Sequence, residues 1–395
     1  MNRYIKGIVK GVMRWVMDEW EALMIAFGRR IEIKKFKDPR RIKIQNEYPL
    51  SKEQKEEIDK FYLANYGKKI DYCWHQNYAA HSGRLDYKYF PELLFIPEFE
   101  RFENQDKAMV SVVSDKNILP IFAKAAGVRM PRTIVACTNG IYKDDDFNIL
   151  SEAEALDRLK QTEGFIKPSV DSCSGEGCML FSGKDILGLK NGILRICTGG
   201  GYNIEYKKDF VVQERLVCHE SIRAIYPKSV NTFRVISYIW HNEIKIMPVI
   251  MRIGQGGGVV DNAHAGGMFV SVSNDGRLGK TAMTEFNDKY QKHPDTGLVF
   301  ENHQIYNFDK VLQSVRRIHA LVTRLGVVNW DFTINQDGEA VLLEANVSSG
   351  SIWLAQMAHG KAGFGEDTAE VLRWVRFMEG LPKSKRKEYC YGERK

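Results

Sequence analysis

Two carboxylates, Asp331 and Glu344, lie in β-rich runs on either side of Asp337-Gly338. Asp-Gly is a strong signal for a two-residue hairpin turn. That turn pairs Asp331 directly with Glu344, with Cβ atoms roughly 4.5–5.5 Å apart. Because side chains alternate along a strand, Asn346 shares the face of Glu344, and Ala345 lies on the other face.

Two facing carboxylates repel each other unless a proton or a cation lies between them. Oxygen ligands with no His or Cys nearby suit Mg²⁺ that also holds a polyphosphate. The alternative is an exposed pair at a strand end that water solvates. The hairpin by itself leaves both interpretations open.

A Ser/Gly-rich loop separates two apolar runs within residues 163–181. The first run ends in Lys167, and small residues follow at Ser172, Ser174, Gly175 and Gly177. Small residues let backbone N–H groups approach an anion closely, and the lysine adds a positive charge. The segment is not a P-loop, because no Gly-Lys-Ser/Thr opens a helix. A glycine-rich hairpin without a ligand is the alternative.

Upstream of this loop, the sequence predicts a helix that begins at Ser114 and ends at Gly127, with a strand beyond Pro131. This helix carries Lys116 near its start.

Two strands are expected between the loop and the hairpin. The first, short strand lies in residues 209–217. The second, in residues 229–238, alternates so that Asn231 and Phe233 share one face, while Thr232 and Arg234 share the other.

The order of these pieces resembles the signature of the ATP-grasp superfamily: a lysine, a lysine with a glycine loop, a short strand, an arginine, and Asp331 before Glu344-x-Asn346. Four further segments resemble the sugar-transfer-associated ATP-grasp family, namely Arg84–Pro91, Val230–Arg234, Val260–Gly267 and Trp330–Phe332. The resemblance covers roughly residues 70 to 375. It implies an α+β ATP-grasp fold, in which two α+β subdomains with antiparallel sheets grip ATP, beside a helical N-terminal region.

The resemblance also implies how the nucleotide is held. Lys116 and Lys167 are expected to contact the α- and β-phosphates of ATP. The glycine loop, with Gly175 and Gly177, is expected to fold over the β- and γ-phosphates.

The hinge between the two halves is expected to offer backbone hydrogen bonds to adenine from Gln213, Glu214 and Leu216. Glu220 is at the spacing of the family's ribose-binding acid, although His219 is a rival.

The metal ligands that the resemblance implies are Asp331, Glu344 and Asn346, with Glu344 bridging two Mg²⁺ ions. Arg234 and Arg252 are candidates for holding the transferred phosphoryl group or an acyl-phosphate, because a forked guanidinium matches that anion.

One position departs from the amino-acid ligases of this superfamily, which often carry an arginine two residues before the magnesium-binding aspartate. Asn329 stands there, and Arg252 is the best replacement. If Arg252 does not reach the cleft, simple phosphoryl transfer becomes the better interpretation.

The glycine-rich segment 254–267 contains candidate substrate-binding residues. His264 is either a general base near the acceptor or a loop histidine with no role. Asp261 and Asn262 either bind substrate or cap a turn.

Composition agrees with a soluble, cytoplasmic enzyme. The chain has 395 residues, 44% of them hydrophobic, and seven cysteines without a Cys-x-x-Cys pair, which fits a reducing compartment. No apolar run is long enough to span a bilayer. The net charge of +7 comes without an aromatic–basic repeat, so no nucleic-acid partner is expected.

The first 27 residues have a helical period, and a basic cluster runs from Arg29 to Lys43. One hypothesis is that residues 1–43 contact the inner face of an anionic membrane peripherally. The alternative is a helix that packs on the catalytic body or on a second subunit.

Five segments are expected along the chain: a basic amphipathic leader (1–50), a helical, aromatic-rich region opened by a Ser51–Gln54 capping box (51–110), the two ATP-grasp subdomains (111–216 and 217–380), and a loosely ordered polar tail (381–395). In the second subdomain, helices are expected at 308–325 and 366–378.

The resemblance implies a Mg²⁺- and ATP-dependent ligase that joins a carboxylate to an amine through an acyl-phosphate, in the biosynthesis of bacterial surface polysaccharides. Its substrates would be a small or sugar-linked acid and an amine. The alternatives are a kinase that phosphorylates a hydroxyl and an ATP-binding module without turnover.

Overall fold

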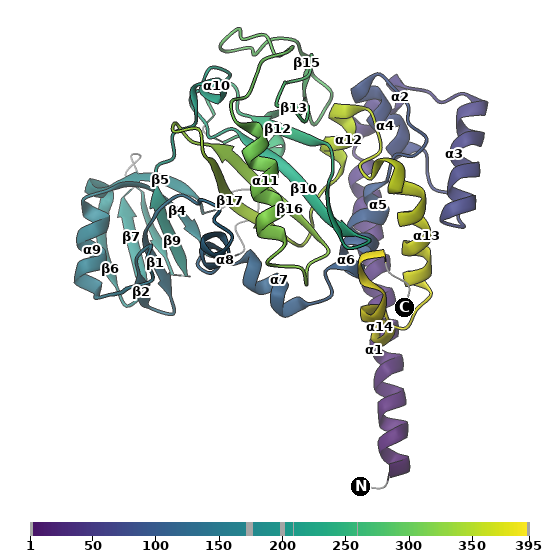
Figure 1. The fold of residues 1–395 in the computed structure, drawn as a ribbon, viewed down its shortest axis with the longest axis horizontal. Helices are drawn as coiled ribbons and strands as arrows, with labels where there is room; N and C mark the ends of the chain where they lie inside the picture. Colours follow the sequence, from purple (N-terminus) through teal and green to yellow (C-terminus); the bar gives the residue numbers. More distant parts are fainter. Residues whose placement is uncertain (1–2, 171–176, 198–201, 208, 259, 393–395) are drawn as a thin grey trace.

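The computed structural model describes residues 3–170, 177–197, 202–207, 209–258 and 260–392. Three parts lie in a row in Figure 1: a small lobe of β-strands, a large central sheet, and a group of helices from both ends of the chain.

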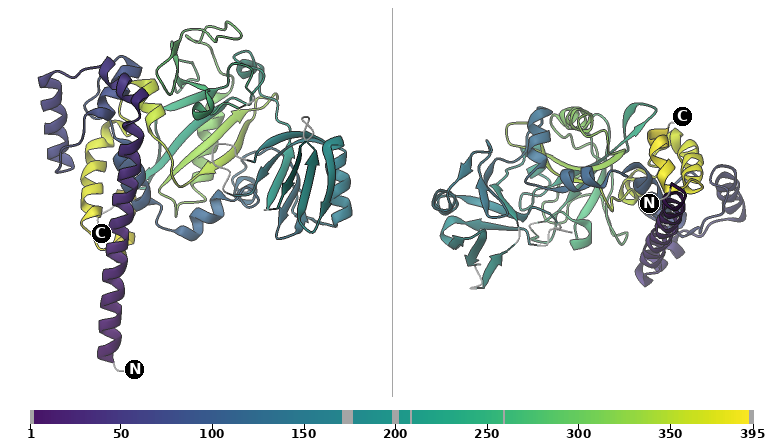
Figure 2. Two further views of the ribbon diagram at one scale, coloured as in Figure 1. Left: turned by 180° about the vertical axis from the view of Figure 1, so that it is seen from behind. Right: turned by 90° about the horizontal axis from the view of Figure 1, so that it is seen from below.

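Helices from the two ends of the chain pack side by side in Figures 1 and 2. The capping box at Ser51 and Gln54 is confirmed and begins α3. The N-terminal helices are α1 (Arg3–Phe36), α2 (Pro39–Glu47), α3 (Lys52–Asn65), α4 (Cys73–Ser82), α5 (Glu92–Leu94), η1 (Phe95–Glu100) and α6 (Arg101–Glu103). The C-terminal ones are α12 (Trp353–His359), η5 (Gly365–Asp367), α13 (Thr368–Glu379), α14 (Lys383–Arg386) and η6 (Lys387–Gly392).

The small lobe is an antiparallel sheet in the order β3-β2-β1-β9-β4-β5, beside a three-stranded sheet β6-β7-β8. Its elements are β1 (Thr133–Thr138), β2 (Ile141–Lys143), β3 (Ile149–Leu150), α9 (Glu152–Lys160), β4 (Glu163–Pro168), β5 (Met179–Ser182), η3 (Gly183–Asp185), β6 (Ile186–Lys190), β7 (Ile193–Cys197), β8 (Asn203–Tyr206) and β9 (Phe210–Glu214). Two helices, α7 (Lys107–Ser114) and α8 (Leu119–Ala125), connect it to the rest of the molecule.

The large sheet is antiparallel in the order β15-β14-β13-β12-β10-β16-β17, with β11 paired to β10. Its strands are β10 (Thr232–Trp240), β11 (Glu243–Ile246), β12 (Val249–Ile253), β13 (Met268–Val272), β14 (Ala282–Thr284), β15 (Lys289–Tyr290), β16 (Val327–Ile334) and β17 (Ala340–Asn346). The helices associated with it are α10 (Glu220–Arg223), η4 (Ala263–Ala265) and α11 (Phe308–His319).

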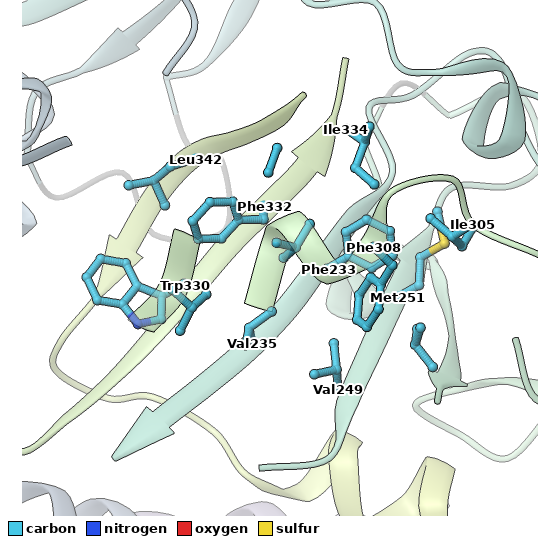
Figure 3. Packing of buried hydrophobic residues seen from close by; sticks show 14 of the residues in the cluster. Phe233, Val235, Val249, Met251, Ile305, Phe308, Trp330, Phe332, Ile334 and Leu342 are labelled. Carbon is cyan, nitrogen blue, oxygen red and sulfur yellow. The ribbon is translucent and has the colours of Figure 1, made fainter. Parts of the chain in front are cut away.

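The two faces of the large sheet differ in what covers them. On one face, Phe233 and Val235 of β10 pack with β16 and α11, and the Phe233 and Phe308 rings lie 5.1 Å apart (Figure 3). Alternation sends Thr232 and Arg234 to the other face, as predicted. Further along that face, the N-terminal helices and α12 cover the sheet in a cluster that includes Phe36, Trp74, Tyr78, Ile250 and Trp353.

The β16–β17 hairpin has the predicted pairing of Asp331 with Glu344, but its loop length and part of its register differ from the prediction. Its loop has three residues rather than two: Asn335 N–H donates to the Glu339 carbonyl (3.0 Å), and Gly338 has a φ of 75°. This loop pairs Phe332 with Leu342, one residue out of the predicted register. A β-bulge at Leu343 restores it, so the expected pairing of Asp331 with Glu344 is confirmed.

Two predicted helix boundaries are wrong. The helix expected from Ser114 begins at Leu119 instead, because Ser114 ends α7 and the Asp115 carboxylate accepts the Asn117 N–H (2.8 Å) in a turn. Lys116 therefore lies in this turn rather than in a helix. The helix expected over 308–325 ends at His319.

The expected loose tail is also wrong for its described part. Residues 383–392 form α14 and η6, and Arg386 is buried there. The Arg386 guanidinium lies 4.6 Å from the Phe102 ring and donates to the Met378 carbonyl (2.9 Å). These two contacts tie the tail to the helical core.

None of the described helices has both the length and the apolar character that crossing a bilayer requires.

Candidate active site

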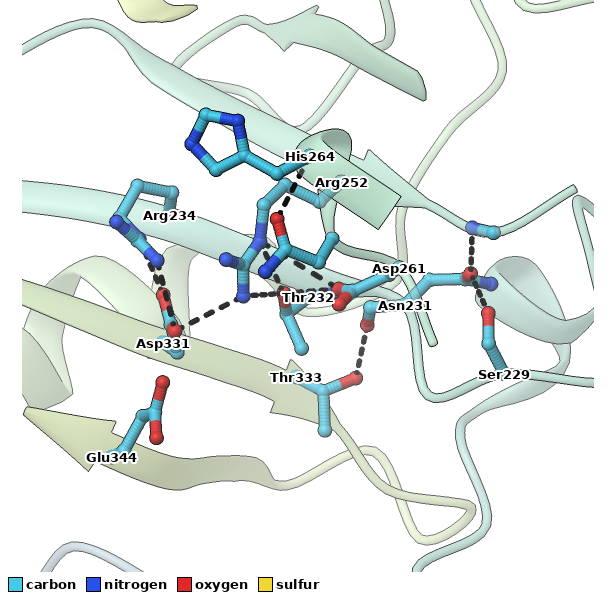
Figure 4. Close-up of polar contacts among 12 residues, drawn as sticks. Ser229, Asn231, Thr232, Arg234, Arg252, Asp261, His264, Asp331, Thr333 and Glu344 are labelled. Atoms are coloured by element: carbon cyan, nitrogen blue, oxygen red, sulfur yellow. Dashed lines mark hydrogen bonds and ion pairs between the residues drawn. The ribbon is translucent and has the colours of Figure 1, made fainter. Parts of the chain in front are cut away.

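Asp331 lies at the centre of a charged cluster on the polar face of the large sheet (Figure 4). β10 pairs with β16 on one side and with β12 on the other, which brings Arg234 and Arg252 to Asp331. Arg234 Nε donates to Oδ1 (2.5 Å), and its Nη2 donates to Oδ2 (3.1 Å). Arg252 Nη2 donates to the same Oδ2 (3.0 Å). Burial opposes ionisation here, but the two guanidinium groups hold the pKa of Asp331 well below its usual range.

Glu344 lies across the ladder from Asp331, and Asn346 lies beside both. Asn346 Nδ2 is 3.4 Å from Asp331 Oδ2 and 3.5 Å from Glu344 Oε1, as expected for one shared face. Burial, followed by the charge of Asp331, raises the pKa of Glu344. The ionised Asp331 therefore disfavours ionisation of Glu344, which is the predicted repulsion.

Both predicted lysines face this pair, Lys167 from the small lobe and Lys116 from the turn between α7 and α8. Lys116 Nζ lies 3.8 Å from Glu344 Oε2, and its backbone N–H donates to the Ser169 carbonyl (2.9 Å), which ties its turn to the end of β4. Lys167, on β4, is half-buried; burial lowers its pKa, and the charge of Glu344 opposes that change. With all three carboxylates ionised, two lysines and two arginines face Asp331, Glu344 and Asp261, which leaves a net charge of +1 (four positive, three negative). A polyanion complements such a site.

Thr232 and Asp261 hold Arg252 in place. The Thr232 hydroxyl accepts from Arg252 Nε (3.0 Å) and Nη2 (2.7 Å) and donates to Asp261 Oδ2. The Thr232 N–H also donates to Asp261 (2.9 Å). The Asp261 carboxylate therefore accepts its hydrogen bonds from Thr232, inside the protein. The role of Thr232 escaped the sequence analysis, although its place two residues before Arg234 was the available signal.

Asn329, where an arginine was missing from the expected pattern, is fully buried, and neither of its side-chain polar atoms has a hydrogen-bond partner in the described chain. Gly350 lies so close that a Cβ atom there would be 2.0 Å from Asn329 Nδ2 and 2.7 Å from Glu100 Oε2. These neighbours leave little space for a longer side chain at position 329. The guanidinium reaches Asp331 from Arg252 instead.

The connection between the lobes carries the predicted hinge residues. Gln213 is buried in β9, and the N–H of Glu214 already donates to the Arg132 carbonyl (2.9 Å). Residues 215–217 leave the sheet, and Val217 is anchored by Gln336 N–H (3.0 Å). Within the described residues, the backbone of Leu216 forms no hydrogen bond, so its groups are available to a ligand.

Glu220 and His219 lie outside the charged cluster. Glu220 is 75% exposed and lies 4.0 Å from Arg223. His219 Nδ1 accepts the Ser221 N–H (3.1 Å), and its ring stacks on Tyr306 at 4.6 Å. His219 thus has a structural role at the start of α10, which leaves Glu220 as the accessible acid.

The glycine loop is described only in part, since residues 171–176, including Gly175, lie outside the described residues. Gly177 has a φ of 72°, and its carbonyl accepts from the Tyr206 hydroxyl (2.7 Å). A side chain at this position would be strained by that backbone and would meet Pro168 at 2.9 Å.

Asn262 and His264 lie on the segment that follows Asp261. Asn262 Oδ1 accepts the His264 N–H (3.0 Å), so Asn262 caps a turn. His264 Nδ1 lies 2.6 Å from Glu285 Oε2, and its ring stacks 5.9 Å from Trp353. Glu285 also pairs with Arg41, so His264 meets the N-terminal helices at the rim of the site.

Divalent-cation ligands at this site would be the oxygens of Asp331, Glu344 and Asn346. The described residues contain no group of three or more His, Cys, Asp or Glu that could hold a metal ion alone. Two carboxylates and an amide do fit Mg²⁺, because this ion takes few protein ligands and completes its shell with phosphate oxygens and water. Glu344 is one-third exposed, which leaves its oxygens accessible.

Comparison with solved structures finds low similarity over part of the chain. An N5-carboxyaminoimidazole synthase from Aspergillus clavatus, in complex with ADP, is 10% identical, with a TM-score of 0.34 over 62% of this chain and 47% of that one. An L-amino acid ligase from Bacillus licheniformis is 9% identical, with a TM-score of 0.34 over 72% and 51%. A D-alanyl-alanine synthetase A from Vibrio cholerae is 12% identical, with a TM-score of 0.36 over 68% and 65%. The chain thus covers between about half and two-thirds of these proteins.

No curated protein matches the chain. Residues 95–369 match the family described as sugar-transfer associated ATP-grasp, which is more than half of the chain. The two lobes, the antiparallel sheets and the added N-terminal helices agree with the fold that the sequence predicted. The chain belongs to the sugar-transfer associated ATP-grasp family.

Proposed function

We propose that this protein is an ATP-dependent carboxylate–amine ligase that acts through an acyl-phosphate. The observation that carries the proposal is the cluster in which Lys116, between α7 and α8, and Lys167, on the small lobe, face Glu344 of the large sheet. Four cations against three carboxylates leave a positive site, which fits a triphosphate held between the lobes. The base would hydrogen-bond to the free backbone of Leu216.

In the first step, an oxygen of the acid attacks the γ-phosphorus, and the bond to the β–γ bridging oxygen breaks, which releases ADP. The lysines would orient the phosphates, and Arg234 and Arg252, which meet at Asp331, would stabilise the charge that develops on the transferred group. Bound Mg²⁺, in one or two ions on Asp331, Glu344 and Asn346, would neutralise phosphate charge.

In the second step, the amine attacks the carbonyl carbon of the acyl-phosphate. The carbon–oxygen bond to phosphate breaks, inorganic phosphate leaves, and the nitrogen loses a proton. His264 follows Asp261 by three residues and is hydrogen-bonded to Glu285, and it is our candidate acceptor for that proton. We assign the acid and the amine to surface-polysaccharide precursors, since the family is sugar-transfer associated, and the use of ATP favours a cytoplasmic location.

A kinase that phosphorylates a hydroxyl is the second candidate, because Asn329 replaces the arginine expected of an amino-acid ligase. The contact of Arg252 with Asp331 favours the ligase, since it supplies the missing guanidinium.

Incubation with Mg²⁺, ATP, hydroxylamine and a panel of sugar acids separates the candidates. A hydroxamate together with ADP is the expected result. A phosphorylated product without hydroxamate would assign the protein to the kinases. ATP binding without ADP release, across acids and hydroxyl acceptors alike, would indicate a non-catalytic module.

A further inference from the structure

The long helix α1 has two different apolar faces. One face packs on the protein: Ile25 and Phe36 are buried, and Glu21 receives two hydrogen bonds from Arg101 (2.5 and 2.8 Å). Figures 1 and 2 show that the N-terminal half of α1 extends well beyond the rest of the molecule.

The opposite face carries a stripe of large exposed apolar side chains. Their spacing alternates between four and three residues, which places them along one side of a helix. The stripe consists of Val9, Met13, Val16, Trp20, Leu23 and Phe27, with exposed fractions of 45–63%. Val12, Trp15 and Met17 beside it are also more than half exposed. At 1.5 Å per residue the stripe is about 27 Å long, larger than the scattered apolar residues of an ordinary surface.

Charged residues are distributed unevenly around this stripe. Through residue 17 the helix carries four basic residues and no acidic one. Lys34, seven residues after Phe27, continues the line of the stripe and is exposed. Asp18 faces the protein, where it accepts the Lys383 N–H (2.7 Å), and Glu19 is the one acid that flanks the stripe.

We infer that this stripe, Val9–Phe27, lies in the interface of an anionic membrane, with the helix parallel to the surface. Apolar side chains would enter the headgroup boundary, and Trp15 and Trp20 would lie at its edge. Lys10, Arg30 and Lys34, beside or in line with the stripe, would contact anionic headgroups.

A second copy of the chain is a poorer occupant, because self-pairing gives no charge complementarity. In a parallel pair, the charged residues that flank the stripe, Lys10 and Glu19, are nine residues apart and do not meet. In an antiparallel pair centred on the stripe, Lys10 lies level with Ala26, and no acid faces it.

Fewer basic residues of the N-terminal region are available to a membrane than the sequence suggested. Within the basic cluster at 29–43, Arg29 pairs with Glu98, and Arg41 pairs with Glu285. Arg29 joins α1 to η1, and Arg41 joins α2 to the segment after β14, so these two arginines serve the fold, whereas Arg30 and Lys34 stay exposed on α1.

Flotation of the full chain with phosphatidylglycerol-containing vesicles tests the inference without any substrate. Wild-type protein is expected to float with these vesicles. The floating fraction is expected to be at least tenfold smaller with pure phosphatidylcholine vesicles, and smaller at high salt. The double variant Val16→Glu, Trp20→Glu is expected to lose at least tenfold of the bound fraction while keeping its thermal unfolding midpoint, because both side chains are exposed.

The matched control is Ile149→Glu, Leu187→Glu, which makes the same charge change at exposed apolar residues of the small lobe. Its flotation is expected to equal that of the wild type. Failure of the wild type to float, or equal flotation of the V16E/W20E variant, would overturn the inference. A dimer in light scattering that V16E/W20E dissociates, without flotation, would assign the stripe to a second copy and also overturn it.

Discussion

The molecule buries carboxylates in two regions and treats them in opposite ways. Asp331, on the large sheet, receives three charged hydrogen bonds from two arginines and stays ionised. Glu92, at the start of α5, is 3% exposed, and neither of its oxygens has a hydrogen bond of normal geometry in the described chain. The fold thus stabilises an ionised carboxylate at Asp331, in the candidate site, and a protonated one at Glu92, in the helical core.

Glu92 illustrates the suppressed case. Burial, followed by the charge of nearby Glu32, raises the pKa of Glu92 to about 8; the Ser351 hydroxyl, Lys35 and the Ile352 amide approach the carboxyl and only partly oppose this. Near neutral pH the group is therefore mostly protonated. A neutral acid in a helical core needs no counter-ion, whereas the ionised Asp331 requires its arginines.

Removing the charge of Glu344 gives the largest expected effect. Glu344→Gln keeps the side-chain shape but removes the carboxylate that faces Asp331 and Lys116. We expect ADP formation to fall by at least ~10³-fold, of the order found when a key electrostatic group is removed, with an unchanged circular-dichroism spectrum. The control is Asp337→Asn, the same chemical change at the exposed hairpin loop, which should retain full activity. Near-wild-type rates for Glu344→Gln would contradict the assignment of Glu344 as a metal ligand.

The same substitution at Glu92 should act on stability. Glu92 ionises near pH 4.5 when unfolded and near pH 8 in the fold, so its stabilising contribution is complete below pH 4.5 and is lost as pH rises through 8. Glu92→Gln cannot ionise, so its free energy of unfolding lacks this pH-dependent loss. We expect the free energy of unfolding of the variant minus that of the wild type to be roughly 2–4 kcal/mol larger at pH 8 than at pH 4.5. Urea unfolding at both pH values measures this. An unchanged difference would show that Glu92 is ionised in the fold.

Arg252→Lys tests whether the fork of the guanidinium matters beyond its charge. Lysine cannot bind Thr232 and Asp331 together in the same geometry, and we expect turnover to fall about 10–100-fold. Arg129→Lys, at an exposed pair with Glu339, serves as the control. Equal rates for both variants would mean that positive charge alone suffices at position 252.

The smallest effect is expected at the exposed acid beside the hinge. Glu220→Gln should raise KM for ATP about 3–5-fold without changing kcat, as loss of one ribose hydrogen bond would. His219→Ala should instead lower thermal stability, because His219 caps α10 and stacks on Tyr306. A rise in KM for the histidine variant alone would reverse this assignment.

Local periodicity predicted the site better than it predicted its surroundings. Alternation placed Thr232 and Arg234 on the correct face, and the Asp-Gly signal located the hairpin. The pairing of Asp331 with Glu344 came out right because a three-residue loop and a bulge at Leu343 offset each other. A turn signal specifies neither loop length nor bulges.

Contacts between distant segments lay beyond the sequence pattern. In the sequence, Arg29 and Arg41 belong to one basic cluster. Their partners, Glu98 and Glu285, are far along the chain, and no local pattern reveals them. The burial of Arg386 against Phe102 was missed for the same reason. Hydrophobic periodicity in α1 marked a helix, but only the folded chain shows which of its faces is covered.

The most direct test of the account is a crystal structure with Mn²⁺ and an unhydrolysable ATP analogue, in which anomalous scattering locates the metal. We predict a metal ion about 2.0–2.3 Å from oxygens of Asp331 and Glu344, with Lys116 and Lys167 on the phosphates. Metal and phosphates bound away from these residues, with Asp331 still held only by Arg234 and Arg252, would contradict it.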